Sequence, residues 1–107
     1  MSVISIEVDH HIKRAYIANY VAARVDSDIL LYFPDLKKFA SLNTSASSLW
    51  KIFERSMKRK RPLSTENLYS SLSQSYHEIT AIQAAEAMLS FCDQLASAGV
   101  LKWEERP

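Results

Sequence analysis

The side chains that could carry chemistry in this chain are scattered rather than grouped. The single cysteine, Cys92, recurs at helical spacing among apolar residues, which favours a packed thiol over a nucleophile. His10 and His11 are adjacent, so their side chains diverge in an extended segment, and a metal site there needs further ligands. His77 follows Tyr76 near a predicted helix end, where a capping or surface role is expected.

Carboxylates and loop motifs add no catalytic pattern. Glu66, Glu78, Glu86 and Asp93 show no pairing that differs from ordinary solvated helix faces. There is no glycine-rich phosphate loop, CxxC or HExxH spacing, and the lone glycine disfavours a backbone phosphate cradle. We therefore expect a protein that is not an enzyme and that binds neither a cofactor nor a metal.

The composition is that of one soluble globular domain. The chain has 107 residues, of which 48% are hydrophobic and 23% charged. Thirteen basic and twelve acidic residues give a formal charge of +1, so no overall field steers the chain to nucleic acid or a membrane. The N-terminus lacks a signal-peptide pattern, and no apolar run approaches the roughly 20 residues that span a bilayer. A single cysteine fits a reducing compartment, so we expect a cytoplasmic protein with no membrane partner.

The elements that must position any site begin with strands. The run AYIANYVAAR at 15–24 is rich in β-branched and aromatic residues, DSD at 26–28 supplies a turn, and ILLYF follows at 29–33. Pro34 and Asp35 break this second strand, and a third strand resumes over 37–42. The pattern predicts a three-stranded antiparallel sheet.

The first fourteen residues are assigned to an N-terminal extension that precedes a domain of residues 15–107. Alternation in VISIEV could form an extra strand there. If the extension crosses to another subunit, the chain forms a homodimer, so the oligomeric state stays open.

The stretch SLNTSASSLW at 41–50 marks the passage from the third strand into a helix. Asn43 and Thr44 can both accept hydrogen bonds from the first helical turn. A helix to about residue 57 is predicted because apolar residues recur at three- and four-residue steps. These residues are Ala46, Leu49, Trp50, Phe53 and Met57. KRKRP at 58–62 ends the helix, since basic residues favour a helix C-terminus and proline disfavours a helical predecessor.

Two more helices are predicted in the second half. Ser64 caps the first of them, and Thr80 caps the second, where Gln83 completes a capping box. The residues expected to face the core are Leu68, Leu72 and Tyr76, then Ala84, Met88, Phe91 or Cys92, and Leu95. Gly99 suits a left-handed helix end, and residues 100–103 can pack back on the domain. The predicted fold is α+β and winged-helix-like, with a three-stranded antiparallel sheet followed by three α-helices.

Two binding signals compete in this predicted fold. The basic cluster at 58–61 could contact phosphates, as in a winged-helix DNA-binding protein, or could be a solvated loop. The near-neutral charge and the acidic residues Glu86 and Asp93 on the third helix argue against nucleic acid. The second signal is the strand at 37–42, whose open edge could accept an extended peptide or pair with a second subunit in a purely structural dimer.

An ordered set of motifs resembles the PqqD-like family. The set comprises LLYFPD, a short strand ending in SLN, TSASSLWKIF, LYSSLSQSY and MLSFCDQLASAGVL, within residues 28–103. Its strongest elements are Leu42, Asn43, Ala46, Leu49 and Trp50, joined by L…GVL at 95–101. The chain departs from the family in ERSMKRKRPLS, where a short Asp-Gly turn is common, and in its longer N-terminus. Domains of this family are also called RiPP recognition elements, because they bind leader segments of ribosomally made, post-translationally modified peptides.

The resemblance implies a non-catalytic adaptor. In the family, the leader of a precursor peptide adds as a strand to the third strand, packs on the third helix and is presented to a separate modifying enzyme. Partners implied are a radical S-adenosylmethionine enzyme, a leader protease or another tailoring enzyme. The peptide-binding residues carried over are Lys37, Lys38, Phe39, Ala40, Ser41 and Leu42 on the strand, and Ala84, Ala87, Met88, Phe91, Gln94 and Leu95 on the helix. Lys37 or Lys38 could meet acidic leader residues, whereas Asn43 and Trp50 are assigned to structure.

Overall fold

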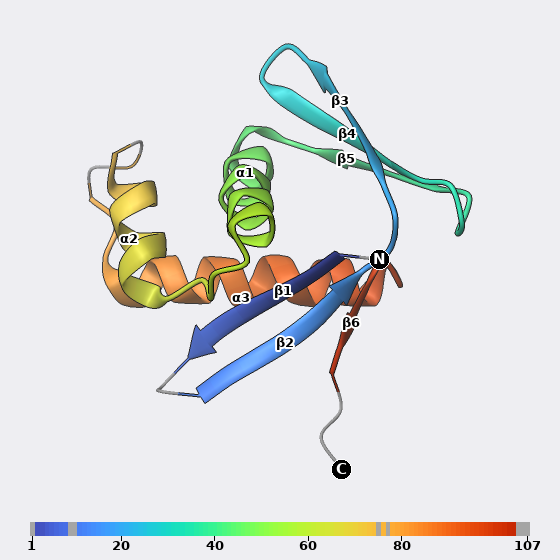
Figure 1. The fold of residues 1–107 in the computed structure, drawn as a ribbon. Coiled ribbons are helices and arrows are strands. Elements are labelled where there is room, and N and C mark those ends of the chain that lie inside the picture. Colours follow the sequence, from blue (N-terminus) through green and yellow to red (C-terminus); the bar gives the residue numbers. More distant parts are fainter. Residues whose placement is uncertain (1, 9–10, 75, 77, 105–107) are drawn as a thin grey trace.

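The fold is α+β, as predicted, and contains two three-stranded antiparallel sheets with three helices. The computed structural model describes residues 2–8, 11–74, 76 and 78–104. The elements in chain order are β1 Ser2–Val8, β2 His11–Ile17, β3 Val21–Val25, β4 Asp28–Phe33, β5 Lys38–Leu42, α1 Thr44–Arg59, α2 Thr65–Ser73, α3 Ala81–Ser97 and β6 Leu101–Trp103. Figure 1 shows α1 between the two sheets, with α3 running beneath it.

The predicted three-stranded sheet is confirmed in the order β3-β4-β5. A two-residue turn joins β3 to β4, and its first residue, Asp26, has a φ of 57°, which aspartate tolerates better than most residues. Residues 34–37 form the second turn, where the Leu36 N–H donates to the Phe33 carbonyl over 3.1 Å. Lys37 closes that turn with a φ of 52°. Alternate residues of β4, namely Ile29, Leu31 and Phe33, are buried against the helices.

The second sheet, β1-β2-β6, was not predicted as a sheet, although the extra strand in VISIEV is confirmed as part of β1. The strand predicted over 15–24 is wrong as one element, because β2 ends at Ile17 and β3 starts at Val21. The boundary drawn between the extension and the domain falls inside β2, where Ala15 and Ile17 pair with β6. The β3-β4-β5 sheet is therefore complete before the helices begin. The β1-β2-β6 sheet is completed only by β6, which follows the helices.

Local sequence signals set the helix ends. Asn43 caps α1, and its side chain accepts from the Ala46 N–H over 2.9 Å, as predicted. Ser64 caps α2, and Thr80 with Gln83 forms the predicted capping box of α3. Gly99 has a φ of 80°, which confirms the predicted left-handed position after α3.

The helices bury most of the predicted stripes. Trp50 and Phe53 of α1 pack with Phe91 of α3, at ring-centroid distances of 5.6 Å for Trp50–Phe53 and 6.2 Å for Phe53–Phe91. Leu68 and Leu72 of α2 are buried, but the prediction for Tyr76 is wrong: α2 ends at Ser73, and Tyr76 is exposed. A residue beyond the last helical turn no longer follows the helical period.

Ser47 is the one fully buried polar side chain of α1 among the described residues, and it joins the helix to the sheet. Its hydroxyl accepts from the Ile29 N–H and donates to the Leu42 carbonyl, each over 3.0 Å. Ile29 and Leu42 face each other across β4 and β5, so the hydroxyl is inserted at the end of their ladder. The hydroxyl satisfies two buried backbone groups at once.

We expect Ser47→Ala to lower the free energy of unfolding by about 2–6 kcal/mol, because each of the two orphaned buried backbone groups costs about 1–3 kcal/mol. Urea unfolding followed by circular dichroism measures this loss. The matched control is Ser48→Ala, whose hydroxyl only donates to the Thr44 carbonyl within the helix. Equal stabilities of the two variants would contradict the bridging role.

Candidate peptide-binding site

The outer strand of the β3-β4-β5 sheet, β5, has an open edge. Backbone groups of alternate residues point to the same side in an antiparallel ladder. Because Ser47 joins the Ile29 N–H to the Leu42 carbonyl, Leu42 directs its groups toward β4. Phe39 and Ser41 therefore direct their N–H and C=O groups away from β4, and no other described residue bonds to these groups. Such an edge can accept another extended chain.

The C-terminal end of α3 lies beside the start of this edge. The Lys38 ammonium donates to the Ala98 carbonyl over 2.8 Å, which ties the beginning of β5 to the end of α3. Ala87, Gln94 and Ala98 follow at seven- and four-residue spacing and so share one side of the helix. A separate open hollow of about 1000 Å³, which Gln83 and Ala87 help to line, lies at the N-terminal half of α3. The edge and this helix side together form the candidate site.

The α3 residues of the predicted site divide between this side and the core. Ala87 is partly buried and Gln94 is exposed, both on the side that carries Ala98. The other four point into the core and are almost completely buried; they are Ala84, Met88, Phe91 and Leu95. Their side chains support the surface beside β5 rather than form it.

The β5 residues divide between the two faces of the sheet. Leu42 is buried, Ala40 packs partly against the core, and Lys38 shares their face. Ser41 and Phe39 lie on the opposite face, where Phe39 is 68% exposed. Only backbone groups of Phe39 and Ser41 thus face the edge, while side chains on either side flank it.

An aromatic pair marks the outer face of the sheet. The Phe39 ring stacks on Tyr32 of β4 with centroids 4.5 Å apart and an interplanar angle of 25°. The two residues face each other directly in the ladder, so this is a cross-strand pair. A strand added to β5 would place alternate side chains beside Phe39 on this face.

The two lysines predicted to meet acidic peptide residues have different environments. Lys38 already donates to the Ala98 carbonyl, whereas Lys37 occupies the exposed turn before β5. Lys37 is thus the better placed of the two to meet a carboxylate on a bound chain.

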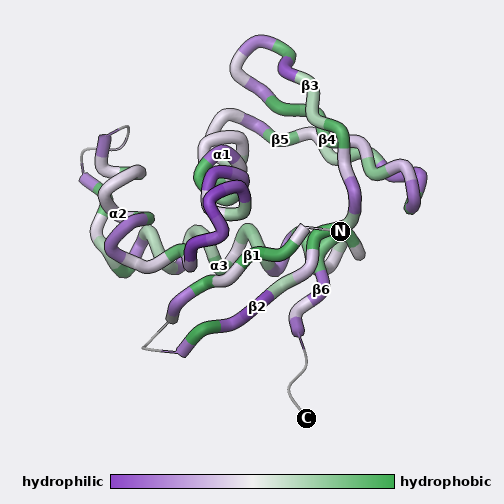
Figure 2. The backbone as a smooth tube through the Cα atoms, viewed as in Figure 1, coloured by the Kyte–Doolittle hydropathy of each residue, from purple (hydrophilic) through white to green (hydrophobic). Residues whose placement is uncertain are grey.

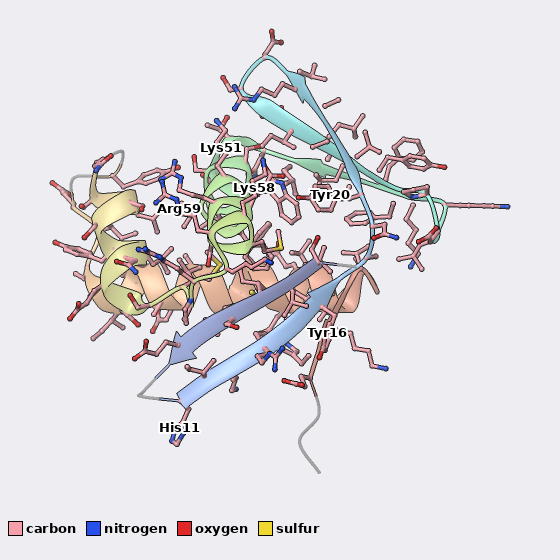
Figure 3. All side chains as sticks on the ribbon, in the orientation of Figure 1. His11, Tyr16, Tyr20, Lys51, Lys58 and Arg59 are labelled. Atoms are coloured by element: carbon pink, nitrogen blue, oxygen red, sulfur yellow. The ribbon has the colours of Figure 1, made fainter. Side chains whose placement is uncertain are left out.

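The chemical side chains stay apart in the fold. Among the residues that the structure describes, no group of three or more His, Cys, Asp or Glu could hold a metal ion. Figure 3 places His11 at the far end of the β1-β2 hairpin, away from α1. His10 and His77 lie outside the described residues.

Cys92 is buried in the core of α3, as its position in the apolar stripe predicts. Burial, with a smaller contribution from the nearby Asp93 charge, raises the pKa of the Cys92 thiol from 9.0 to about 12. The thiol is therefore neutral in the folded protein over the physiological range. Because folding raises the pKa of this thiol, ionisation of Cys92 lowers the free energy of unfolding only when the pH rises above the pKa that the thiol has in the unfolded chain.

We expect Cys92 to react with a disulfide reagent at about pH 8 only as fast as the protein opens, because the thiolate is the nucleophile. Stopped-flow absorbance measures the rate, and the guanidinium-unfolded protein gives the reference. A folded-state rate within about tenfold of the unfolded rate would contradict this burial.

Two features of the site were not anticipated from the sequence. The first is the bridge that Ser47 forms to the sheet. Its signal in the sequence was a polar residue at a core position of α1. The tie between Lys38 and Ala98 joins residues 60 positions apart, and nothing in the local sequence indicates it.

Comparison with known proteins finds no match for this chain. No family model, no curated protein and no solved structure matches the chain. None of the helices in the described ranges is long and apolar enough to cross a membrane.

Proposed function

We propose that this protein is a non-catalytic adaptor that binds the leader of a ribosomally made precursor peptide by strand addition along β5. The observation that carries the proposal is the open edge of β5 at Phe39 and Ser41, held beside α3 by the bond from Lys38 to Ala98. The ordered motifs that resemble PqqD-like domains support the same placement.

The edge offers two N–H donors and two carbonyl acceptors, which any extended backbone can pair with. Side chains of an added strand alternate between faces. Those on one face meet Ala40 and lie on the side of the C-terminal end of α3, and those on the other meet Phe39. Backbone pairing supplies sequence-tolerant affinity, and these flanking side chains supply selectivity.

An adaptor of this kind acts by raising the effective concentration of a precursor near a separate enzyme. The partners that the resemblance implies are a radical S-adenosylmethionine enzyme, a leader protease or another tailoring enzyme. Any cofactor chemistry then belongs to the partner.

DNA binding in a winged-helix manner is the competing function. One observation favours it: the basic residues at 58–61 form an exposed cluster. This cluster lies at the end of α1 and not on α3, which buries five residues and exposes Glu86 and Asp93. A recognition helix must approach a polyanion, so those carboxylates oppose this use of α3.

An NMR titration of the labelled protein tests the proposal. The ligands are synthetic leader peptides from short open reading frames beside the gene, each with a scrambled control. We expect shifts at residues 38–42 and along the α3 side with Ala87 and Gln94. If no leader moves these signals while duplex DNA shifts 58–61 and α3, the DNA-binding function replaces this proposal.

A further inference from the structure

The basic residues of the chain are concentrated at one place. Residues 51–61 hold six of the 13 Lys and Arg residues and one of the 12 Asp and Glu residues, so this segment carries +5 and the rest of the chain −4. Figure 2 shows the C-terminal turns of α1 as a strongly hydrophilic stretch, and Figure 3 shows Lys58 and Arg59 projecting from this helix. A near-neutral protein therefore has one strongly positive surface.

The positive segment is ordered by bonds of its own. Lys60 ends α1 in a left-handed conformation, with a φ of 53°. The Arg61 N–H donates to the Ser56 carbonyl over 3.3 Å, and the Ser56 hydroxyl donates to the Arg61 carbonyl over 2.6 Å. Leu63 then pairs with β1. These contacts fix the backbone that carries Lys60 and Arg61.

A cleft of about 580 Å³ lies between this segment and β1. Its lining includes Lys58, Lys60 and Arg61 of this segment. It also includes Arg14 of β2, and Val3 and Ser5 of β1. Among the described residues, neither Lys60 nor Arg61 forms an ion pair. Their charges remain available to a ligand.

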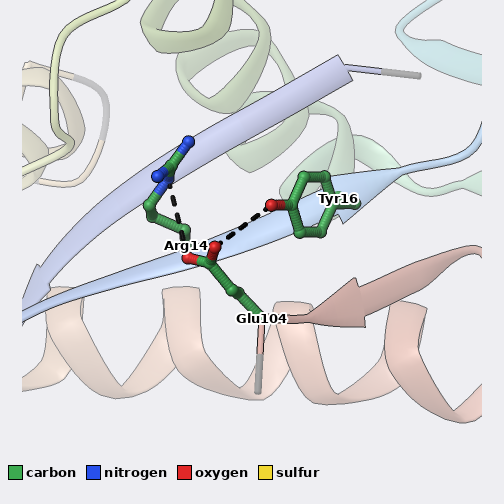
Figure 4. Close-up of polar contacts among 3 residues, drawn as sticks. All are labelled: Arg14, Tyr16 and Glu104. Atoms are coloured by element: carbon green, nitrogen blue, oxygen red, sulfur yellow. Dashed lines mark hydrogen bonds and ion pairs between the residues drawn. The ribbon is translucent and has the colours of Figure 1, made fainter. Parts of the chain in front are cut away.

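Arg14 is held in position from the other side. It faces Ser5 across the β1-β2 ladder, and its guanidinium lies 3.7 Å from the Glu104 carboxylate. The same carboxylate accepts from the Tyr16 hydroxyl over 3.2 Å, as Figure 4 shows.

Of the described residues that line the cleft, Glu54 alone is acidic, and its carboxylate is already engaged. It accepts from the Tyr20 hydroxyl over 2.7 Å and pairs with Lys58 at 3.6 Å. Burial and this carboxylate raise the pKa of Tyr20, so the phenol stays a donor to Glu54. With Arg14, Lys58, Lys60 and Arg61 against Glu54, the described lining of the cleft keeps a net positive charge.

The edge of β1 is only half occupied in this cleft. Leu63 donates to the Ser5 carbonyl over 2.7 Å and accepts from the Glu7 N–H over 2.9 Å. Since alternate residues share a direction, Val3 points the same way as Ser5 and Glu7. The Val3 N–H and C=O and the Ser5 N–H therefore face the cleft, and no other described residue bonds to them.

We propose that this cleft is a second strand-addition site, which binds an extended peptide segment rich in Asp or Glu. Backbone groups of the ligand continue the β1 edge where Leu63 stops, and its carboxylates meet Lys60, Arg61 and Arg14. The open backbone groups favour a peptide over nucleic acid, because a peptide backbone supplies both donors and acceptors. This site lies in the other sheet from β5 and stands apart from the leader-binding proposal.

The probe is a fluorescein-labelled decapeptide of alternating glutamate and threonine, measured by anisotropy at about 0.15 M salt. Measurements use a Ser41→Pro background, in which addition to β5 is blocked. We expect the double variant Lys60→Gln, Arg61→Gln to bind the peptide at least about fivefold more weakly. The control, Lys51→Gln with Lys102→Gln, removes the same charge outside the cleft and should bind within about twofold of the parent.

A second peptide tests the backbone contribution. Methylating the amide nitrogens of its four central residues keeps every charge but removes donors, and we expect binding to be lost. Slower hydrogen exchange at Val3 and Ser5 should accompany binding of the unmethylated peptide. The proposal is overturned if the cleft variant binds the peptide with unchanged affinity or if the methylated peptide binds equally well. Tighter binding of duplex DNA would also overturn it.

Discussion

Replacing Ser41 by proline is expected to weaken leader binding at least tenfold, which corresponds to about 1.4 kcal/mol. The Ser41 N–H faces away from β4, so proline removes a donor at the open edge without removing a bond of the sheet. Its ring also occupies the space that an added strand needs. Calorimetric titration with a leader peptide that shifts β5 in the NMR experiment measures the loss.

Ser41→Ala is the matched control, because it removes the same hydroxyl and keeps the N–H. It should bind within about twofold of the parent. A leader peptide methylated at its amide nitrogens should also fail to bind the parent protein, which tests strand addition without altering the fold. Undiminished binding of the proline variant, or of the methylated peptide, would rule out addition to β5.

A large effect on stability is expected from Phe53→Ala, which should lower the free energy of unfolding by about 3–5 kcal/mol. Phe53 is fully buried and contacts the rings of Trp50 and Phe91, where both sheets and α3 meet around α1. Since small domains are stable by only about 5–15 kcal/mol, this loss removes much of the margin. Urea unfolding monitored by tryptophan fluorescence measures it.

Phe39→Ala deletes the same side chain at an exposed position and serves as the comparison. Its stack on Tyr32 should contribute only about 0.5–1.5 kcal/mol. Similar losses in the two variants would mean that the core is not centred on Phe53.

Short-range features could be predicted from the sequence because each depends on a few neighbouring residues. Asn43, Ser64 and the pair Thr80 with Gln83 cap their helices through side chains one turn away. The turn at 26–27 likewise needs only local chemistry. Pairing partners are a different problem, since alternation in VISIEV indicates a strand but does not say which strand lies beside it. The β1-β2-β6 sheet was missed for that reason.

The candidate site was predictable only in part for a related reason. Helical spacing identifies the apolar stripe of α3, but it does not separate residues that face the core from those one step around the helix. Met88 and Phe91 belong to the first group and Ala87 and Gln94 to the second. The open edge of β5 followed from its place as the last strand before the helices, whereas its attachment to α3 through Lys38 required the three-dimensional arrangement.

The pairing of β2 with β6 has a consequence for how the chain folds. Tyr16 and Glu104, which bond at the end of this pairing, are 88 positions apart, whereas each β3-β4-β5 connection is a short turn. Closing a long loop costs more chain entropy than closing a hairpin, and nonlocal contacts slow folding. The β3-β4-β5 sheet with α1 should therefore form early, and docking of β6 should limit the rate. In a kinetic refolding experiment, substitutions in β6 should slow the rate-limiting phase, whereas formation of the early β3-β4-β5 unit should keep its rate.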